Sequence, residues 1–179
     1  MRALVPVGNG SEDIETVTII DVLRRAGVEV VVASVEAEPA VTLARGCRLS
    51  ADVPLAEAAG EFDLIALPGG DAGARALARS GALIERLRRQ KAAGKWFAAI
   101  CAAPAVVLAA HGLIDDRRAT CYPAFRAQLP RAAGERVVVD GNCVTSQSPA
   151  TAIAFSLKLV EVLCGAAKAR EVGEAMLAT

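Results

Sequence analysis

The stretch K-W-F-A-A-I-C-A-A-P, residues 95–104, organises the chain. Its apolar run from Trp96 to Ile100 has the composition of a buried strand, and Pro104 favours a helix that begins directly afterwards, because a first helical turn does not need the N–H that proline lacks. Cys101 would then stand at a strand-to-helix corner, where free N–H groups of the helix point at its side chain. Their partial positive charge predicts a thiol pKa well below the usual ~8.5. The alternative is an inert, buried structural cysteine.

Length and net charge limit the number of domains and the kinds of partner that the protein is expected to have. The 179 residues suit one domain, spanning residues 1–179. Lys plus Arg number 20 and Asp plus Glu number 20, so no net charge favours a nucleic-acid or membrane partner. The N-terminal run lacks the pattern of a signal peptide, and no apolar stretch has the length of a membrane span. We therefore expect a cytoplasmic location, with neither nucleic acid nor membrane as a partner.

Cysteine and histidine content argues against metal sites and disulfides. The five cysteines are scattered, odd in number and never in C-x-x-C spacing, and the chain has one histidine. We expect no metal and no cofactor. His111 falls near the end of the helix that follows Cys101, about 15 Å along its axis, which excludes a Cys-His triad. The other cysteines are interpreted as structural, with Cys121 the exception nearest the cleft; they are Cys47, Cys121, Cys143 and Cys164.

Alternating strand and helix patterns predict one α/β sandwich with a mostly parallel sheet. Residues 2–7 and 28–34 have strand character, and between them Ser11 is the expected N-cap of a helix that ends at Gly27, so the chain opens with a β-α-β unit. The other expected elements are a hairpin in 41–50, a short helix at 54–58, strands at 62–70 and 119–123, one or two helices in 72–93, a helix from Pro104 to Ala110, a hairpin around Asp140-Gly141, and helices at 149–164 and 167–178.

Three loops should meet at the carboxyl edge of this sheet, where ligands bind in parallel α/β folds. They are residues 8–15, 68–73 and 101–104. The backbone N–H groups of Gly70 and Ala102 are candidate donors to an oxyanion, because a reacting thiol needs a place for developing negative charge.

The first loop offers a proton partner for the thiol. Glu15 lies four residues before Ile19 on the apolar face of the predicted helix, which would turn its carboxyl inward. Burial beside sulfur would raise its pKa and suit it to general acid/base work. The alternative is that the acids of this loop only favour a helix N-terminus. We prefer that alternative for Glu12 and Asp13, and both interpretations stay open for Glu15.

Four motifs resemble the DJ-1/ThiJ/PfpI superfamily, over nearly the whole chain. They are G-S-E-D-I-E-T at 10–16, L-P-G-G at 67–70, A-A-I-C-A-A-P at 98–104 and T-S-Q-S-P-A-T-A at 145–152. The branch most similar holds the human Parkinson-associated protein and the bacterial chaperone YajL. The resemblance implies a flavodoxin-like three-layer α/β/α sandwich and a homodimer. It also implies that Cys101 is a strained nucleophile that oxidises to a sulfinate, that Glu15 hydrogen-bonds its sulfur, and that Gly70 and Ala102 are oxyanion donors.

The same resemblance places Arg45 near the site, contributed across the dimer, and shows two departures. Tyr122 stands where the human-type member has a histidine, which weakens the case for strong His-assisted activity. Ala102 follows the cysteine where the PfpI proteases carry histidine, so peptidase chemistry is not expected. No phosphate-binding loop supports the thiamine-related label of the family.

Two functions of different classes follow. In the first, Cys101 attacks small dicarbonyls, or glycated thiols and amines, as a glyoxalase or deglycase with Glu15 moving the proton. In the second, Cys101 is a non-enzymatic peroxide sensor and the dimer a redox-regulated holdase for unfolded client proteins. A third possibility is a member that kept the fold and lost activity.

Overall fold

The computed structural model describes residues 1–178 and has one seven-stranded sheet in the order β5-β2-β1-β6-β7-β9-β8. Neighbouring strands are parallel, except that β8 and β9 form the expected antiparallel hairpin. The strands are β1 (Arg2–Val7), β2 (Glu29–Ser34), β5 (Val53–Pro54), β6 (Leu64–Leu67), β7 (Trp96–Ile100), β8 (Val137–Asp140) and β9 (Cys143–Ser146). The prediction of a mostly parallel sheet is confirmed.

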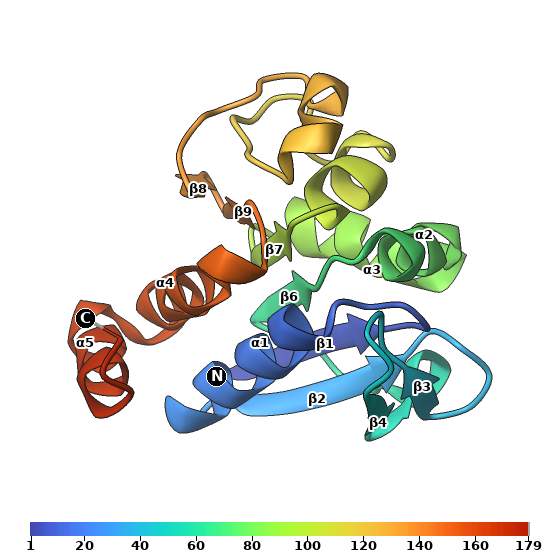
Figure 1. Cartoon of the computed structure of the whole chain (residues 1–179), viewed down its shortest axis with the longest axis horizontal. Coiled ribbons are helices and arrows are strands. Elements are labelled where there is room, and N and C mark those ends of the chain that lie inside the picture. Colours follow the sequence, from blue (N-terminus) through green and yellow to red (C-terminus); the bar gives the residue numbers. More distant parts are fainter. Residues whose placement is uncertain (179) are drawn as a thin grey trace.

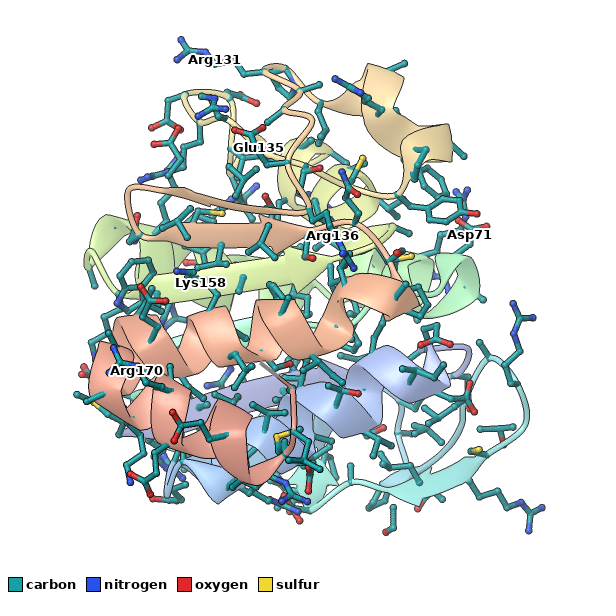
Figure 2. The ribbon with its side chains drawn as sticks, turned by 60° about the vertical axis from the view of Figure 1, so that its left-hand side comes forward. Asp71, Arg131, Glu135, Arg136, Lys158 and Arg170 are labelled. Carbon is teal, nitrogen blue, oxygen red and sulfur yellow. The ribbon has the colours of Figure 1, made fainter. Side chains whose placement is uncertain are left out.

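Helices cover both faces of this sheet. On one face α1 packs against α4, and α4 against α5; Figure 2 looks onto this layer, with Lys158 on α4 and Arg170 on α5. On the other face lie α2, α3 and the short helix η2 (Figure 1). The helices are α1 (Asp13–Arg25), η1 (Leu55–Glu57), α2 (Asp71–Arg79), α3 (Gly81–Ala92), η2 (Pro104–Ala109), η3 (Pro123–Gln128), η4 (Pro149–Thr151), α4 (Ala152–Cys164) and α5 (Ala166–Ala175). The flavodoxin-like three-layer sandwich is confirmed.

Side chains of the central strands alternate between the two layers, as the pleat of a strand requires. In β1, Val5 and Val7 belong to the core beneath α1 and α4, whereas Leu4 belongs to the core beneath α2 and α3. In β7, Ile100 and Phe97 divide in the same way. Both faces of these strands are thus sealed by apolar contacts, so only the ends of the strands remain available for chemistry.

A small hairpin lies beside the loop that follows β1. Its strands are β3 (Ala40–Thr42) and β4 (Arg48–Ser50), which pair antiparallel as predicted. Gly10 N donates to Thr42 O at 2.9 Å, and Ala44 N donates to Ser11 O at 2.8 Å. These bonds fasten the hairpin to the first loop of the carboxyl edge.

The N-cap of α1 differs from the prediction. Glu12, not Ser11, is the N-cap, because the Glu12 carboxylate accepts the Glu15 N–H at 2.8 Å. The Ser11 hydroxyl instead accepts the Gly8 N–H at 3.1 Å and closes the turn after β1. The prediction of a Ser11 cap was wrong by one residue, since an acidic side chain reached the same free amides.

Two other segments differ from their predicted form. The strand expected at 119–123 is wrong: Ala119 makes an isolated bridge, and the Tyr122 N–H turns away to the Cys101 carbonyl. The helix after Cys101 is present but is a π-helix, with hydrogen bonds such as Ala110 N to Ala105 O spanning five residues. A wider turn of this kind is frequent next to functional sites.

Within residues 1–178, no helix is long and apolar enough to cross a membrane.

Candidate active site

Cys101 stands at the predicted corner, directly after β7, with a strained backbone. Its φ is +63°, in the left-handed region that side chains other than glycine rarely adopt, at a cost on the order of 1–2 kcal/mol. Two hydrogen bonds hold this conformation: Cys101 N donates to Ser146 O at 3.0 Å, and Cys101 O accepts from Tyr122 N at 2.8 Å. The residue is 8% exposed, so bulk water is largely excluded from it.

Glu15 projects from the first turn of α1 into the same place. Its side chain is fully buried, and Oε2 accepts the Gly69 N–H at 2.8 Å. Oε1 has no hydrogen bond of good geometry with the described residues, yet the carboxyl lies close enough to the Cys101 thiol for a side-chain hydrogen bond to affect the pKa of both groups. The inward orientation predicted from helical spacing is confirmed.

Burial controls the protonation of Glu15. Removal from water raises the pKa of this carboxyl from 4.5 to about 7, although hydrogen bonds from the Gly69 amide and the Cys101 thiol act in the opposite direction. The charge of Glu12 adds to the rise. The sequence-based expectation of a raised pKa is confirmed, and the carboxyl titrates near neutral pH, where a general acid/base works best.

The expected fall in the pKa of the Cys101 thiol is wrong. Burial, followed by the negative charge of Glu15, raises the pKa of this thiol to about 12, even though the amides of Gly70 and Ala102 act to lower it. Desolvation of sulfur therefore outweighs the helix amides that the sequence emphasised. At neutral pH the pair consists of a thiol beside a carboxyl that is close to half ionised. Proton transfer from Cys101 to Glu15 thus becomes a step of any reaction at this sulfur.

Gly69 and Gly70 make room for this pair. A Cβ at Gly69 would lie 2.6 Å from Cys101 Cβ and 2.8 Å from Glu15 Oε2. Gly70 has φ +80°, and a Cβ there would lie 2.4 Å from Gly10 O. The sequence singled out only Gly70. The close approach at Gly69 was not predicted. The glycine pair was the signal for it, because the left-handed turn requires glycine only at position 70, and a second glycine beside it indicates a place where a side chain would not fit.

Asp13 and Glu12 hold the first loop in place, which agrees with the structural interpretation preferred for them. Glu12 N donates to Gly69 O at 3.0 Å, so α1 and the glycine loop are joined in both directions. Asp13 accepts the N–H of Arg45 at 2.7 Å and that of Cys47 at 3.2 Å. Burial works to raise the pKa of Asp13, but hydrogen bonds from the Cys47 thiol and from these amides hold it below its usual value.

Arg45 and Tyr122 lie outside the buried pair. The Arg45 side chain is exposed, and its guanidinium is not among the groups that shift the pKa of Cys101. Tyr122 is tied to Cys101 through its backbone, while its side chain is 43% exposed. One chain therefore brings together Cys101, Glu15, Gly70 and Ala102, with Tyr122 next to them in the backbone, and places the exposed Arg45 outside this group.

The remaining cysteines and the histidine take varied places. His111 Nε2 pairs with Ala78 O at 3.1 Å, which agrees with a structural role. Cys121 is buried, and its thiol donates to Tyr122 O at 3.3 Å. Cys143 is buried, but Cys47 and Cys164 are exposed, so burial does not explain those two. Among the described residues, no group of three or more His, Cys, Asp or Glu side chains could hold a metal ion.

Comparison with known proteins gives a consistent picture. Residues 1–162 match the model of the DJ-1/PfpI family. The solved structure of "Toxoplasma gondii DJ-1, oxidized" has a TM-score of 0.97 with this chain and 46% identity, covering 98% of this chain and 97% of that one. The Caenorhabditis elegans protein named glutathione-independent glyoxalase DJR-1.2 is 37% identical over 163 residues, covering 88% of this chain and 86% of the relative.

A plant relative is longer. Protein DJ-1 homolog B of Arabidopsis thaliana is 44% identical over 179 residues, which cover 98% of this chain and 41% of that protein. The chain thus spans less than half the length of this relative. The match over residues 1–162 and the near-complete overlap with a DJ-1 structure agree with the strand-to-helix corner built around Cys101, and this chain belongs to the DJ-1/PfpI family.

Proposed function

We propose that the protein is a cysteine-dependent enzyme that converts small dicarbonyls, such as methylglyoxal and glyoxal, or their adducts with thiols and amines. The observation that carries this proposal is the buried pair of Cys101 and Glu15, in which a thiol adjoins a carboxyl with a pKa of about 7. The name of the C. elegans relative, a glutathione-independent glyoxalase, supports the same class of substrate.

The chemistry begins with a proton transfer inside the pair. Ionised Glu15 takes the thiol proton as Cys101 Sγ bonds to the aldehyde carbon of methylglyoxal, and the carbonyl oxygen becomes an oxyanion. The amides of Gly70 and Ala102, which already point at the sulfur, stabilise that oxygen. Proton return from Glu15 gives the neutral hemithioacetal.

The second stage is an internal redox step that needs no outside oxidant. Glu15 removes the proton from the former aldehyde carbon, which gives an enediolate, and returns it to the neighbouring ketone carbon, while the hydroxyl proton of the first carbon passes to the former ketone oxygen. The first carbon thereby becomes a thioester and the second a hydroxyl-bearing carbon. Water then cleaves the thioester, which releases lactate and restores the Cys101 thiol. The net change is addition of one water to methylglyoxal. A glycated thiol or amine would enter through the same sulfur attack.

A second protomer would complete the entrance to this site. Apolar side chains are exposed on α1 at Ile14 and Val17, which are 56% and 53% exposed, and on α4 at Ile153, which is 45% exposed. Since α1 and α4 pack side by side, we propose that this surface forms a homodimer. The exposed Arg45 would then lie near the partner's site, with Tyr122 at the rim of its own. We also propose that residues 1–179 act as one cytoplasmic domain.

The second candidate function is a peroxide sensor whose oxidised form acts as a holdase. The Toxoplasma gondii protein was solved in an oxidised form, and in this chain the amides of Gly70 and Ala102 could receive the oxygens of a sulfinate. However, peroxide reacts with the thiolate, and burial raises the pKa of Cys101 to about 12. The pair therefore suits a carbonyl substrate, whose attack is coupled to proton transfer from Cys101 to Glu15, better than it suits peroxide.

Turnover separates the two functions. The purified protein is supplied with excess methylglyoxal, and lactate is counted per protomer; Cys101→Ser and Glu15→Gln are compared with Cys121→Ser, a matched control in a buried thiol outside the pair. The enzyme is supported by many lactates per protomer, lost in the first two variants and kept in the control. Less than one lactate per protomer, with a mass gain of two oxygens on Cys101 after peroxide, contradicts the enzyme and supports the sensor.

A further inference from the structure

A cavity lies far from the thiol, at the amino ends of β6 and β7. Its volume is about 270 Å³, and Ile65 and Phe62 line it from the sheet side while α3 forms the opposite wall. Cys101 follows the carboxyl end of β7, five residues away along the strand, so the two places are separated by roughly 16 Å of extended chain. The reaction at Cys101 does not use this cavity.

Gln90 brings an unpaired acceptor to this cavity. The side chain is 7% exposed, and its Nε2 donates to Phe62 O at 3.0 Å and to Trp96 O at 2.9 Å. Two carbonyl oxygens on that side fix the orientation of the amide, because only the nitrogen can donate to them. No donor among the described residues bonds to Oε1 of this cavity-lining side chain. This oxygen faces the open cavity and is not sealed from solvent, so a ligand that supplies a donor would take the place of water there.

The rim of the cavity carries excess positive charge. Arg86, Arg89 and Lys95 line it together with one acid, Glu61, which pairs with Lys95 at 2.7 Å. Arg89 lies 3.8 Å from Glu85, so among the described residues Arg86 is the lining cation without an acidic partner. Arg86 donates through Nη2 to Ala58 O at 2.7 Å and to Leu55 O at 3.4 Å, which fixes the guanidinium at the cavity and leaves the N–H groups of Nε and Nη1 available. Basic residues in the last turn of α3 also interact favourably with the helix dipole, but that role does not explain why the Gln90 oxygen accepts no hydrogen bond from the described residues.

We propose that this cavity binds a small organic anion with a carboxylate at one end and an O–H or N–H donor at the other. The carboxylate would meet Arg86, Arg89 and Lys95, and the donor would bond to Gln90 Oε1. A small body between them would lie over Phe62 and Ile65, which are 4% and 2% exposed and therefore present only a narrow strip of carbon surface to the cavity. The site is separate from the proposed function, and its failure would leave that function untouched.

Three probes of one size test the two recognition elements. They are 4-hydroxybenzoate, which has both the carboxylate and the donor; benzoate, which lacks the donor; and methyl 4-hydroxybenzoate, which lacks the charge. Affinities are measured by titration calorimetry, and fluorescence of Trp96, the only tryptophan of the chain, reports binding beside Gln90. We expect 4-hydroxybenzoate to bind at least about tenfold more tightly than either of the others, since each lacks one hydrogen-bonded group.

Variants locate the site. The double change Arg89→Gln with Lys95→Gln should weaken binding of 4-hydroxybenzoate about fivefold, whereas Arg88→Gln, an exposed neighbour on α3 that does not line the cavity, should not change it. Glu61→Gln should strengthen binding, because it removes the competing anion. Gln90→Met should abolish the preference for 4-hydroxybenzoate over benzoate; if that variant does not fold, the comparison of probes in the wild type tests the same oxygen.

Two controls decide the outcome. Binding should be unchanged in Cys101→Ser, which separates this cavity from the thiol site. Equal affinity for the three probes, no change in the double variant, or no binding up to millimolar concentration would each overturn the proposal. In those cases the basic residues serve only the end of α3.

Discussion

The Gly69 N–H donates to Glu15 Oε2 at 2.8 Å, and Glu12 N donates back to Gly69 O at 3.0 Å. The first turn of α1 and the loop after β6 therefore hold one another across the carboxyl edge of the sheet. Because the Glu15 side chain is fully buried at this junction, its proton affinity couples the stability of the fold to pH.

Glu15→Gln should make stability less sensitive to pH. The folded-state pKa of Glu15 is about 7, above its ordinary 4.5, so the folded protein retains a proton that the unfolded chain releases. The stabilisation is fully present below pH 4.5 and is lost as pH rises through about 7, a change on the order of 3 kcal/mol. Urea unfolding should therefore show that, between pH 5 and pH 8, the free energy of unfolding falls more in the wild type than in the variant. An equal change in the free energy of unfolding with pH for the two proteins would contradict this prediction.

Turnover of methylglyoxal should rise with pH around neutrality. Ionised Glu15 is the form that accepts the thiol proton, and its pKa is about 7, so kcat/KM should increase between pH 6 and pH 8. Glu12→Gln removes the charge that raises this pKa and should move the midpoint to lower pH, while the remaining side-chain oxygen can still accept the Glu15 N–H. A midpoint that does not move would show that another group controls the profile.

Cys101→Gly should be more stable than Cys101→Ala. The residue has φ +63°, where alanine is strained and glycine is not, so the difference should be about 1 kcal/mol in favour of glycine. At an ordinary buried strand end the order would be reversed. Thermal unfolding of the two variants measures it, and both lack the thiol, so loss of sulfur packing cancels in the comparison.

Local sequence patterns predicted most helices and strands of this fold, because apolar spacing and the positions of proline and glycine largely decide where these elements begin and end. The run from Trp96 to Ile100, followed by Pro104, was sufficient to place Cys101 at a corner. Helical spacing allowed an inward Glu15 but left open that it only favours a helix N-terminus, and the structure shows the side chain fully buried. The strand expected near Tyr122 failed because a long-range partner, the Cys101 carbonyl, takes its N–H. No local pattern contains that partner.

The electrostatics of the site were harder to predict than its geometry. Sequence shows which amides would point at Cys101, and two of them do lower its pKa. It does not show how completely α1 and the glycine loop remove water from the sulfur, and that desolvation is the larger effect. The same reason explains Gly69: its importance comes from a 2.6 Å approach to Cys101 Cβ, which depends on the packing of three separate segments.

Gly69→Ala should damage the site more than the fold. The added Cβ would lie 2.6 Å from Cys101 Cβ and 2.8 Å from Glu15 Oε2, so the thiol and the carboxyl must move apart. Overpacking of this kind costs about 1–3 kcal/mol, and a displacement near 1 Å between reacting groups costs about 100-fold in rate. Gly81→Ala is the matched control, because nothing lies within 4 Å of its Cβ position in α3 and its φ is not positive. We expect the control to keep both stability and turnover. If Gly69→Ala lost stability but kept full turnover, the close approach of Cys101 and Glu15 would not be needed for the reaction.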